Sequence, residues 1–228
     1  MTPRAMPPIS GARGLLVVLE GPNEVGKTTL ADALSSRLSE RGSPSIVHRF
    51  PGRMPSTLGE HVYRLHHAPR EFGIDAIAPA ALQALHVAAH LDAIERLILP
   101  ALEDGINVVL DRYWWSTIAY GTAGGVSRDL LSSLVAAERL AWQSVEPSLA
   151  VLLDRSSAES AAGDLDMRAE LRREYAKLAH DARALHPVAL VENSGTFERT
   201  LDTILSQLEL AINGATRAPN PTGGHGDA

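Results

Sequence analysis

Along the central part of the chain, short runs of apolar residues alternate with longer stretches in which apolar residues recur every three or four positions. Each short run is almost continuously apolar, which is typical of a parallel β-strand that is covered on both faces. The predicted strands are Leu15–Glu20, Ser45–Arg49, Asn107–Leu110, Leu149–Leu153 and Ala189–Glu192.

The longer stretches have the spacing of helices and fall between or after these strands. The predicted helices are Thr28–Arg41, Pro79–Leu102, Ser127–Trp142, Met167–Ala184 and Phe197–Ile212. Alternating strands and helices call for right-handed crossovers, which place helices on both faces of a parallel sheet. We therefore expect an α/β fold, a five-stranded doubly wound parallel sheet flanked by helices, in one domain over residues 15–212.

The two ends of the chain differ in composition from this central part. Residues 1–14 are rich in proline and glycine, and residues 213–228 read NGATRAPNPTGGHGDA, so we predict a flexible N-terminal segment and a disordered tail. The first fourteen residues lack an apolar segment, and the run that follows them is too short for a signal peptide or a membrane span. A cytoplasmic location is therefore expected.

Composition narrows the classes of partner. The chain has 228 residues, 45% of them hydrophobic, which is enough to bury a full core. Its formal net charge is -6 and it has no run of basic residues, so neither nucleic acid nor an anionic membrane is an expected partner. It contains no cysteine, which excludes disulfides, thiolate metal sites and cysteine nucleophiles.

Residues 21–28, GPNEVGKT, match the phosphate-binding pattern G-x-x-x-x-G-K-[ST] and lie between a predicted strand and a predicted helix, as that pattern requires. Glycines let the backbone turn its N–H groups inward, and the helix N-terminus adds its dipole. The nucleotide-binding residues are predicted to be Asn23, Glu24, Val25, Gly26, Lys27, Thr28 and Thr29.

Lys27 is one of only two lysines in the chain, and all other positive side chains of the Lys/Arg type are arginines. A compact ammonium on a flexible stem reaches between phosphates in a way that a planar guanidinium does not. This use of lysine strengthens the prediction of a P-loop NTPase. The loop alone does not distinguish a kinase from a GTPase or an ATPase.

A second informative stretch is NVVLDRYWWSTIAYG, residues 107–121, in which an apolar strand ends in Asp111 and Arg112. A carboxylate in that place is typical of the residue that orders Mg²⁺, so Asp111 and the hydroxyl of Thr28 are the predicted metal ligands. Trp114 and Trp115 follow and either line a ligand site or make a helix–helix contact; the sequence leaves both open.

The chain resembles the thymidylate kinases, within the P-loop nucleoside monophosphate kinases. Four segments carry the resemblance: LEGPNEVGKTTLADAL, RFPGRMPSTLGE, LHVAAHLDAIERLILPALEDGINVVLDRYWWSTIAYG and, more weakly, LVENSGTFERTLDTI. The resemblance implies ATP and Mg²⁺ as cofactors, a nucleotide-like small molecule as acceptor, and a homodimer. It also implies catalytic roles for Lys27, Asp111 and Arg112.

The resemblance further implies which residues bind the acceptor. Arg53 and Arg112 would clamp its phosphate with bidentate contacts. Asn23 stands where the family usually has an acid that touches the sugar 3′-hydroxyl. Ser116 and Tyr120 would face the base and sugar.

In the family the base-binding helix usually has the pattern L-L-F-x-A-x-R, whereas residues 85–91 of this chain read LHVAAHL. Val87 replaces the stacking phenylalanine and Leu91 replaces the base-reading arginine, so thymine recognition in the usual way is not expected. His86 or His90 would line the acceptor pocket beside them. These histidines are four residues apart as in a zinc helix, but the stretch lacks the glutamate of H-E-x-x-H and a third ligand, so no metal is expected there.

The phosphate loop and the lid depart as well. The segment between Asp154 and the RREY stretch at residues 172–175 is shorter than in the family, which predicts a short lid. Glu24 stands where one branch of the family has an arginine and the other has glycine. A carboxylate near phosphates is repulsive unless it is paired or directed away. Glu24 is therefore expected to point toward an arginine, Arg155 or Arg168, or to bond the acceptor's sugar beside Asn23.

The leading hypothesis is a phosphotransferase that moves the γ-phosphoryl group of ATP to a nucleoside monophosphate, dTMP-like or an analogue of specialised metabolism. Two alternatives stay open at this point. One is a nucleoside or other small-molecule kinase on the same fold, and the other is an ATP-binding protein that has lost catalysis.

Overall fold

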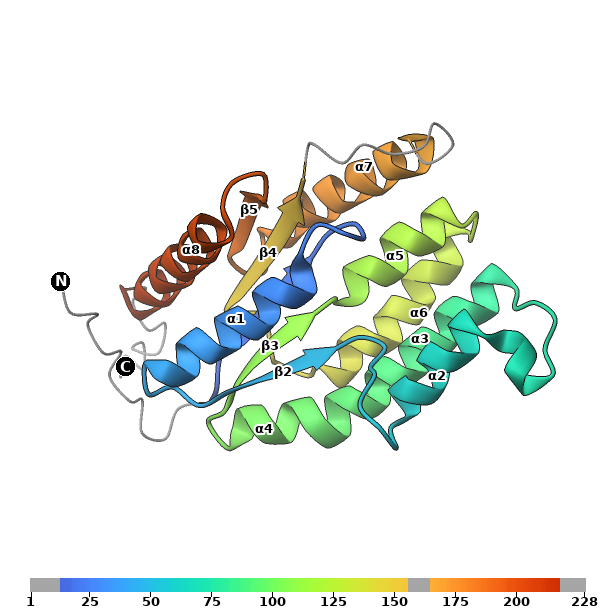
Figure 1. The fold of residues 1–228 in the computed structure, drawn as a ribbon, viewed down its shortest axis with the longest axis horizontal. Coiled ribbons are helices and arrows are strands. Elements are labelled where there is room, and N and C mark those ends of the chain that lie inside the picture. Colours follow the sequence, from blue (N-terminus) through green and yellow to red (C-terminus); the bar gives the residue numbers. More distant parts are fainter. Residues whose placement is uncertain (1–12, 156–164, 218–228) are drawn as a thin grey trace, which may run out of the picture.

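The computed structural model describes residues 13–155 and 165–217, and it contains one five-stranded parallel sheet (Figure 1). The strands are β1 (Leu16–Glu20), β2 (Ser45–Arg49), β3 (Asn107–Asp111), β4 (Leu149–Asp154) and β5 (Val188–Glu192). Their spatial order is β2-β3-β1-β4-β5, with Val18 of the central strand opposite Leu110 on one side and Ala150 on the other. All five predicted strands and the doubly wound parallel sheet are confirmed.

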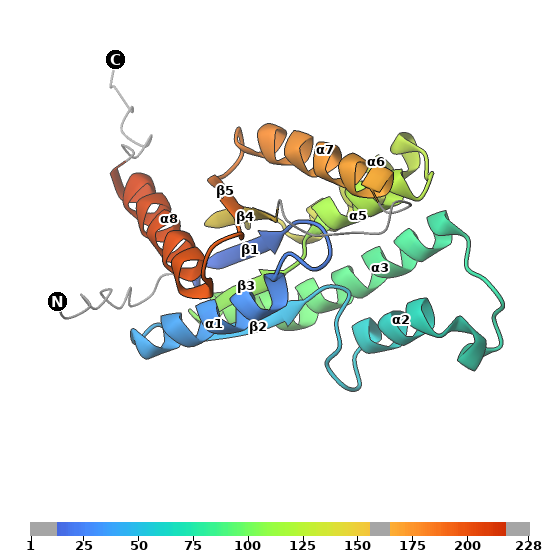
Figure 2. The same ribbon diagram turned by 45° about the horizontal axis from the view of Figure 1, so that its top comes forward.

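Helices cover both faces of this sheet. They are α1 (Lys27–Glu40), α2 (Leu58–His67), α3 (Pro79–Ala93), α4 (Leu99–Glu103), α5 (Trp114–Ala123), α6 (Arg128–Ala141), α7 (Leu165–Ala182) and α8 (Phe197–Arg217). Helices α1 and α8 lie on one face, and α3 to α7 lie on the other; α2 packs outside α3 (Figure 2).

Successive side chains of β1 point to opposite faces of the sheet, so the hydrophobic core has two layers. Val17 and Leu19 pack with α1 and α8, whereas Leu16 and Val18 pack with residues of α4 to α7. All four side chains are at most 1% exposed. Because successive strand residues point to opposite faces, a run of apolar residues is what a strand between two helix layers requires.

Two helices were not among those predicted. Helix α2 begins at a T-x-x-E pattern that the sequence does contain: the Thr57 side chain accepts from Glu60 N at 3.2 Å, and the Glu60 side chain accepts from the N of Ser56, one residue before the N-cap, at 2.8 Å. Helix α5 is apolar on most of its surface and has no side-chain cap of its own, so neither periodicity nor a start signal marks it.

Two predicted helix boundaries are corrected. The predicted helix Pro79–Leu102 is interrupted by a π-helical turn at Ile94–Ile98, which ends two residues before Pro100. Proline has no N–H and its ring crowds the preceding turn, so the helix widens there. The last helix continues to Arg217, which makes the first residues of the predicted tail helical; a glycine such as Gly214 costs a helix only about 1 kcal/mol and does not by itself end it.

Of the predicted short lid, residues 155–171, residues 165–171 form the start of α7, and residues 156–164 lie outside the described residues, as do residues 1–12 and 218–228. Among the helices that are described, none combines the length and the apolar character that crossing a membrane demands.

Candidate active site

The candidate site lies where the carboxyl ends of the strands meet. The phosphate loop, residues 21–26, joins β1 to α1, and Asp111, Asp154 and Asn193 end or follow the neighbouring strands. Figure 2 shows the loop arching over this edge of the sheet, with α5 and α7 beside it. Open parallel sheets bind ligands at this edge.

Two glycines of the loop cannot be replaced without strain, because both have a positive φ and each lies too close to a neighbouring atom. A Cβ on Gly21, whose φ is 139°, would lie 2.1 Å from the Leu153 carbonyl oxygen. A Cβ on Gly26, whose φ is 91°, would lie 2.6 Å from the Asn193 amide nitrogen, which itself bonds the Val25 carbonyl at 2.8 Å. The loop is thus held against β4 and the end of β5 in a conformation that glycine permits.

Lys27 is buried at the first position of α1 and turns back into the loop. Its Nζ donates to the carbonyl oxygens of Gly21 at 2.8 Å and Pro22 at 2.5 Å. Burial and the positive charge of Arg112 lower the pKa of Lys27 to about 7, against the opposing effect of Asp111 and Glu20. The ammonium is placed to move from these two carbonyls to an incoming phosphate.

Thr28 and Asp111, the predicted metal ligands, are in direct contact. The Thr28 hydroxyl donates to Asp111 Oδ2 at 2.7 Å, and Asp111 is 5% exposed. Its other oxygen, Oδ1, is buried and has no hydrogen-bond partner among the described residues. A hydroxyl and an unpaired carboxylate oxygen beside a phosphate loop fit Mg²⁺, which is usually held by one or two protein oxygens together with phosphates and water. No group of three metal-ligating side chains occurs in the described ranges, 86–90 included.

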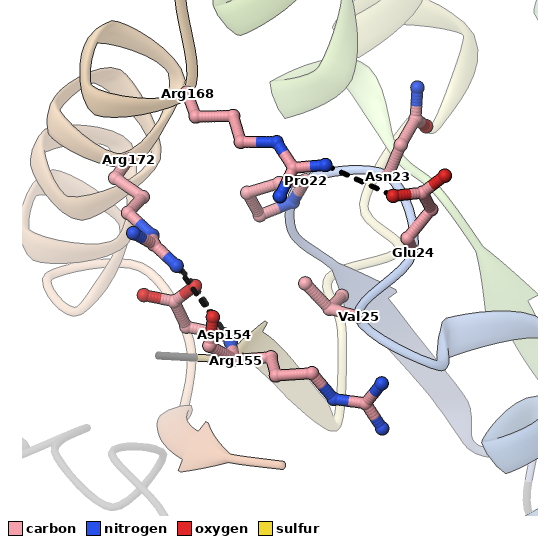
Figure 3. A pocket seen from close by; sticks show the side chains of 8 residues that line it. All are labelled: Pro22, Asn23, Glu24, Val25, Asp154, Arg155, Arg168 and Arg172. Carbon is pink, nitrogen blue, oxygen red and sulfur yellow. Dashed lines mark hydrogen bonds and ion pairs between the residues drawn. The ribbon is translucent and has the colours of Figure 1, made fainter. Parts of the chain in front are cut away.

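Glu24 points toward an arginine, as one of the two hypotheses expected (Figure 3). Its φ is 66°, and its Oε2 accepts from Arg168 Nη2 at 3.0 Å. Arg168 comes from the first turns of α7 and crosses beside Pro22 to reach the loop. Its side chain is 22% exposed, whereas that of Glu24 is 77% exposed. Of the two candidate arginines, Arg168 makes the pair.

Arg155 and Arg172 line the same pocket. Arg155 Nε donates to the Asn193 carbonyl at 3.0 Å. Arg172 donates to Asp154 Oδ1 at 3.0 Å and to the Arg155 carbonyl at 2.6 Å, which ties α7 to the end of β4. Three guanidinium groups therefore gather beside the phosphate loop, an arrangement suited to a polyanion.

Arg112 joins the phosphate loop to the first turns of α5. It has a φ of 78°, and its guanidinium donates to Asn23 Oδ1 and, at 3.1 Å, to Ser116 Oγ. The same group lies 5.2 Å from the centre of the Tyr120 ring. The structure thus brings together four of the predicted acceptor-binding residues, from the loop, the end of β3 and α5.

The comparisons with known proteins agree with this geometry. A sequence model of the thymidylate kinase family matches residues 19–197. The chain belongs to the thymidylate kinase family. It is 29% identical to the thymidylate kinase of Pelobacter propionicus, over 90% of this chain and 99% of that protein. It is 33% identical to the thymidylate kinase of Chlorobaculum parvum, and this match covers 61% of this chain and 61% of that protein.

The fold agrees as well. The crystal structure of thymidylate kinase from Ehrlichia chaffeensis superposes with a TM-score of 0.65 at 20% identity, over 89% of this chain and 99% of that one. At this identity the likeness concerns the fold, a P-loop NTPase with a five-stranded sheet.

The remaining acceptor residues predicted for this thymidylate kinase family member lie in the loop before α2 and on α3. Arg53 is exposed and stacks over the Tyr63 ring at 4.3 Å. Val87 is 4% exposed and Leu91 is half-buried. His90 is buried and bonds Glu138 on α6 through Nδ1 at 2.9 Å.

His86 and His90 therefore differ in what they offer a ligand. The His90 ring also stacks on Phe50 at 4.0 Å, so its side chain joins α3 to its neighbours. His86 Nε2 is buried and has no hydrogen-bond partner within the described part of the chain. Burial and the charges of His90, His66 and Arg112 lower the pKa of His86 to about 3, so its imidazole is neutral at ordinary pH.

Sequence reasoning missed two residues of the site, Glu20 and Tyr175. Glu20 is fully buried and accepts hydrogen bonds from the backbone of Tyr113 and Ser116. Tyr175 of α7 is 1% exposed and its hydroxyl lies 2.9 Å from Ser116 Oγ. An acid at the end of an otherwise apolar strand is the signal that could have identified Glu20.

Proposed function

We propose that this member of the thymidylate kinase family transfers the γ-phosphoryl group of ATP to the phosphate of a nucleoside monophosphate. The observation that carries the proposal is the bond between Arg112 and Asn23. The bond keeps the Arg112 guanidinium beside the phosphate loop, which supports a role for Arg112 in binding a second anionic substrate next to ATP. Phosphoryl transfer needs little covalent chemistry from the protein, so two adjoining phosphate sites are most of what the reaction requires.

On the donor side, the N–H groups of residues 21–28 and Lys27 would hold the β- and γ-phosphates of ATP. Thr28 and Asp111 would hold Mg²⁺, which when bound neutralises charge on the phosphates. Their contact at 2.7 Å and the unpaired Asp111 Oδ1 support this assignment.

The transferring group also needs a positive charge at its open side, and we assign that role to Arg168. In the structure its guanidinium bonds Glu24, at a position of the loop next to the phosphate site. Glu24 would act as the residue that holds Arg168 across the loop, so that its carboxylate is neutralised and its own repulsion of phosphate is reduced.

On the acceptor side, Arg112 and Arg53 would bind the phosphate, with Asn23 and Tyr120 near the sugar. The base would meet the face of α3 that carries Val87 and Leu91, and we propose that His86 rather than His90 offers it a hydrogen bond. His90 is already bonded to Glu138, whereas His86 Nε2 is unpaired within the described residues. A neutral imidazole in this place suggests an acceptor that is dTMP-like or an analogue with a modified base.

A screen for ADP release tests the proposal. The full chain is incubated with Mg²⁺ and ATP and with matched pairs of nucleosides and their 5′-monophosphates, dTMP included. The proposal predicts turnover with one or more monophosphates and none with the matching nucleosides, and loss of turnover in Lys27→Ala. Turnover of nucleosides alone, or no acceptor-dependent ADP, would contradict it.

The family resemblance also leads us to propose a homodimer. Light scattering from the full chain tests this: a mass of twice 24.4 kDa is expected, and a monomer at micromolar concentration would contradict it.

A further inference from the structure

Glu20 lies between the phosphate loop and the start of α5, on the side where the acceptor is proposed to bind. The proposed function gives it no contact with either substrate. It is the last residue of β1, its exposed fraction is 0%, and it directly precedes Gly21 of the loop. Most of its hydrogen bonds come from the start of α5.

One carboxylate oxygen of Glu20 caps α5. Oε1 accepts from the backbone N of Tyr113 at 2.8 Å and of Ser116 at 2.9 Å. Tyr113 is the N-cap residue of α5 and Ser116 its third residue, and these are the two N–H groups that a capping box satisfies. Since α5 has no side-chain cap of its own, the Glu20 carboxylate at the end of β1 serves as its N-terminal cap.

The other oxygen, Oε2, accepts from the Ser116 hydroxyl at 2.8 Å. The same hydroxyl lies 3.1 Å from Arg112 Nη1 and 2.9 Å from the Tyr175 hydroxyl. A serine hydroxyl has one hydrogen and two lone pairs. With Glu20 ionised, a single arrangement satisfies every group: Ser116 donates to Glu20, and Arg112 and Tyr175 donate to Ser116.

This arrangement fixes Arg112 on two sides. Nη1 is held through Ser116 by Glu20, and Nη2 is held by Asn23 of the phosphate loop. Burial outweighs the charge of Arg112 and the bonds from Ser116 and Tyr113, so the pKa of Glu20 is raised overall, and these partners are what favour its ionised form. A buried carboxylate is costly unless it is paired and bonded, and here it is bonded to Tyr113 and Ser116, which lie next to Arg112 at the start of α5.

We propose that Glu20 is a positioning residue, which orients the Arg112 guanidinium toward the acceptor's phosphate through Ser116 and the first turn of α5. Tyr175 completes the arrangement from α7. Only the identity of the anion that Arg112 binds rests on the proposed function; the positioning itself does not.

The kinetic test uses Glu20→Gln, which keeps the shape of the side chain but removes its charge. With ATP and dTMP, the KM for dTMP is expected to rise about tenfold or more while the KM for ATP stays within about twofold, because a hydrogen bond to a charged group is lost on the acceptor side. Glu40→Gln is the matched control, since Glu40 pairs with Arg37 at the far end of α1. An equal rise in both KM values, or no change in either, would overturn the proposal.

A second measurement does not depend on turnover. In ¹⁵N NMR spectra of the full chain, the Arg112 guanidinium and the Tyr113 and Ser116 amides are expected to exchange slowly with solvent. All three should exchange faster in Glu20→Gln and remain unchanged in Glu40→Gln. Ser116→Ala should release the guanidinium while keeping the Tyr113 amide protected. If dTMP is not turned over, the proposed function fails for that acceptor, and these exchange rates still decide the role of Glu20: unchanged Arg112 exchange in Glu20→Gln refutes it.

Discussion

Replacing Glu24 by Gln removes the carboxylate that holds Arg168 across the phosphate loop. The pair is 3.0 Å long, and its side chains are 77% and 22% exposed for Glu24 and Arg168. In the dry interior two such charges would interact strongly, but a pair as open as this one is largely screened by water. Exposed pairs contribute about 0.2–1 kcal/mol, which corresponds to a change in rate of about 1.4- to 5-fold.

The two partners are therefore expected to behave very differently. Glu24→Gln should lower kcat by about 1.4- to 5-fold without changing the KM for dTMP, because it only loosens Arg168. Arg168→Ala should lower kcat by about a thousandfold or more, the range measured for arginines that neutralise a transferring phosphoryl group.

The assay is coupled ADP release under saturating ATP and dTMP, with Glu40→Gln as the control for loss of an exposed paired carboxylate at the other end of α1. The double variant of Glu24 and Arg168 should be no slower than Arg168→Ala, since Glu24 acts only through Arg168. Additive losses, or an Arg168→Ala enzyme within threefold of wild type, would refute the reasoning. A rise in the KM for dTMP in Glu24→Gln would instead favour a contact with the acceptor's sugar.

Three further predictions follow from the site and the fold. Because the pKa of Lys27 is lowered to about 7, its ammonium loses its proton as the pH rises through 7. The value of kcat/KM for ATP should therefore fall above pH 7 in the wild type but not in Lys27→Arg. A wild-type profile that stays flat to pH 9 would contradict this. Arg53→Ala and Arg112→Ala should each raise the KM for the monophosphate by tenfold or more, because a hydrogen bond to a charged group contributes about 1.5–3 kcal/mol. Unchanged KM values in both variants would exclude a phosphate clamp. Thr57→Ala removes the cap of α2 and should lower the free energy of unfolding by about 1 kcal/mol in urea titrations, with kcat unaffected.

The sheet could be predicted from the sequence because its strands are buried on both faces. A strand between two helix layers has to be apolar at successive positions, as β1 and β3 are, and such a run is hard to mistake once turn signals bound it. The phosphate loop was equally clear, since its glycines, its lysine and its hydroxyl each have a separate physical task.

Helix α5 and the residues that support Arg112 were not predictable in the same way. Helix α5 is capped by Glu20, which is 93 residues away in sequence from Tyr113, so no local pattern marks its start. For Glu24 the sequence left two candidate arginines and a contact with the acceptor's sugar, because a like-charge argument requires a favourable partner nearby but does not say whether the end of β4, α7 or the acceptor supplies it. His90 illustrates the reverse case: its place in the base-binding helix suggested a contact with the acceptor, and its bond to Glu138 was visible only in the fold.

The most direct test of the account is to identify the product. Full-length protein is incubated with Mg²⁺, ATP and the best acceptor from the monophosphate panel, and the products are followed by ³¹P NMR. Phosphoryl transfer to a nucleoside monophosphate should give equal amounts of ADP and a second nucleoside diphosphate, whose new phosphorus signal is coupled to the acceptor's original phosphate, and neither product should form with Lys27→Ala. ADP accompanied only by inorganic phosphate, or phosphate joined to a hydroxyl of the acceptor, would contradict it.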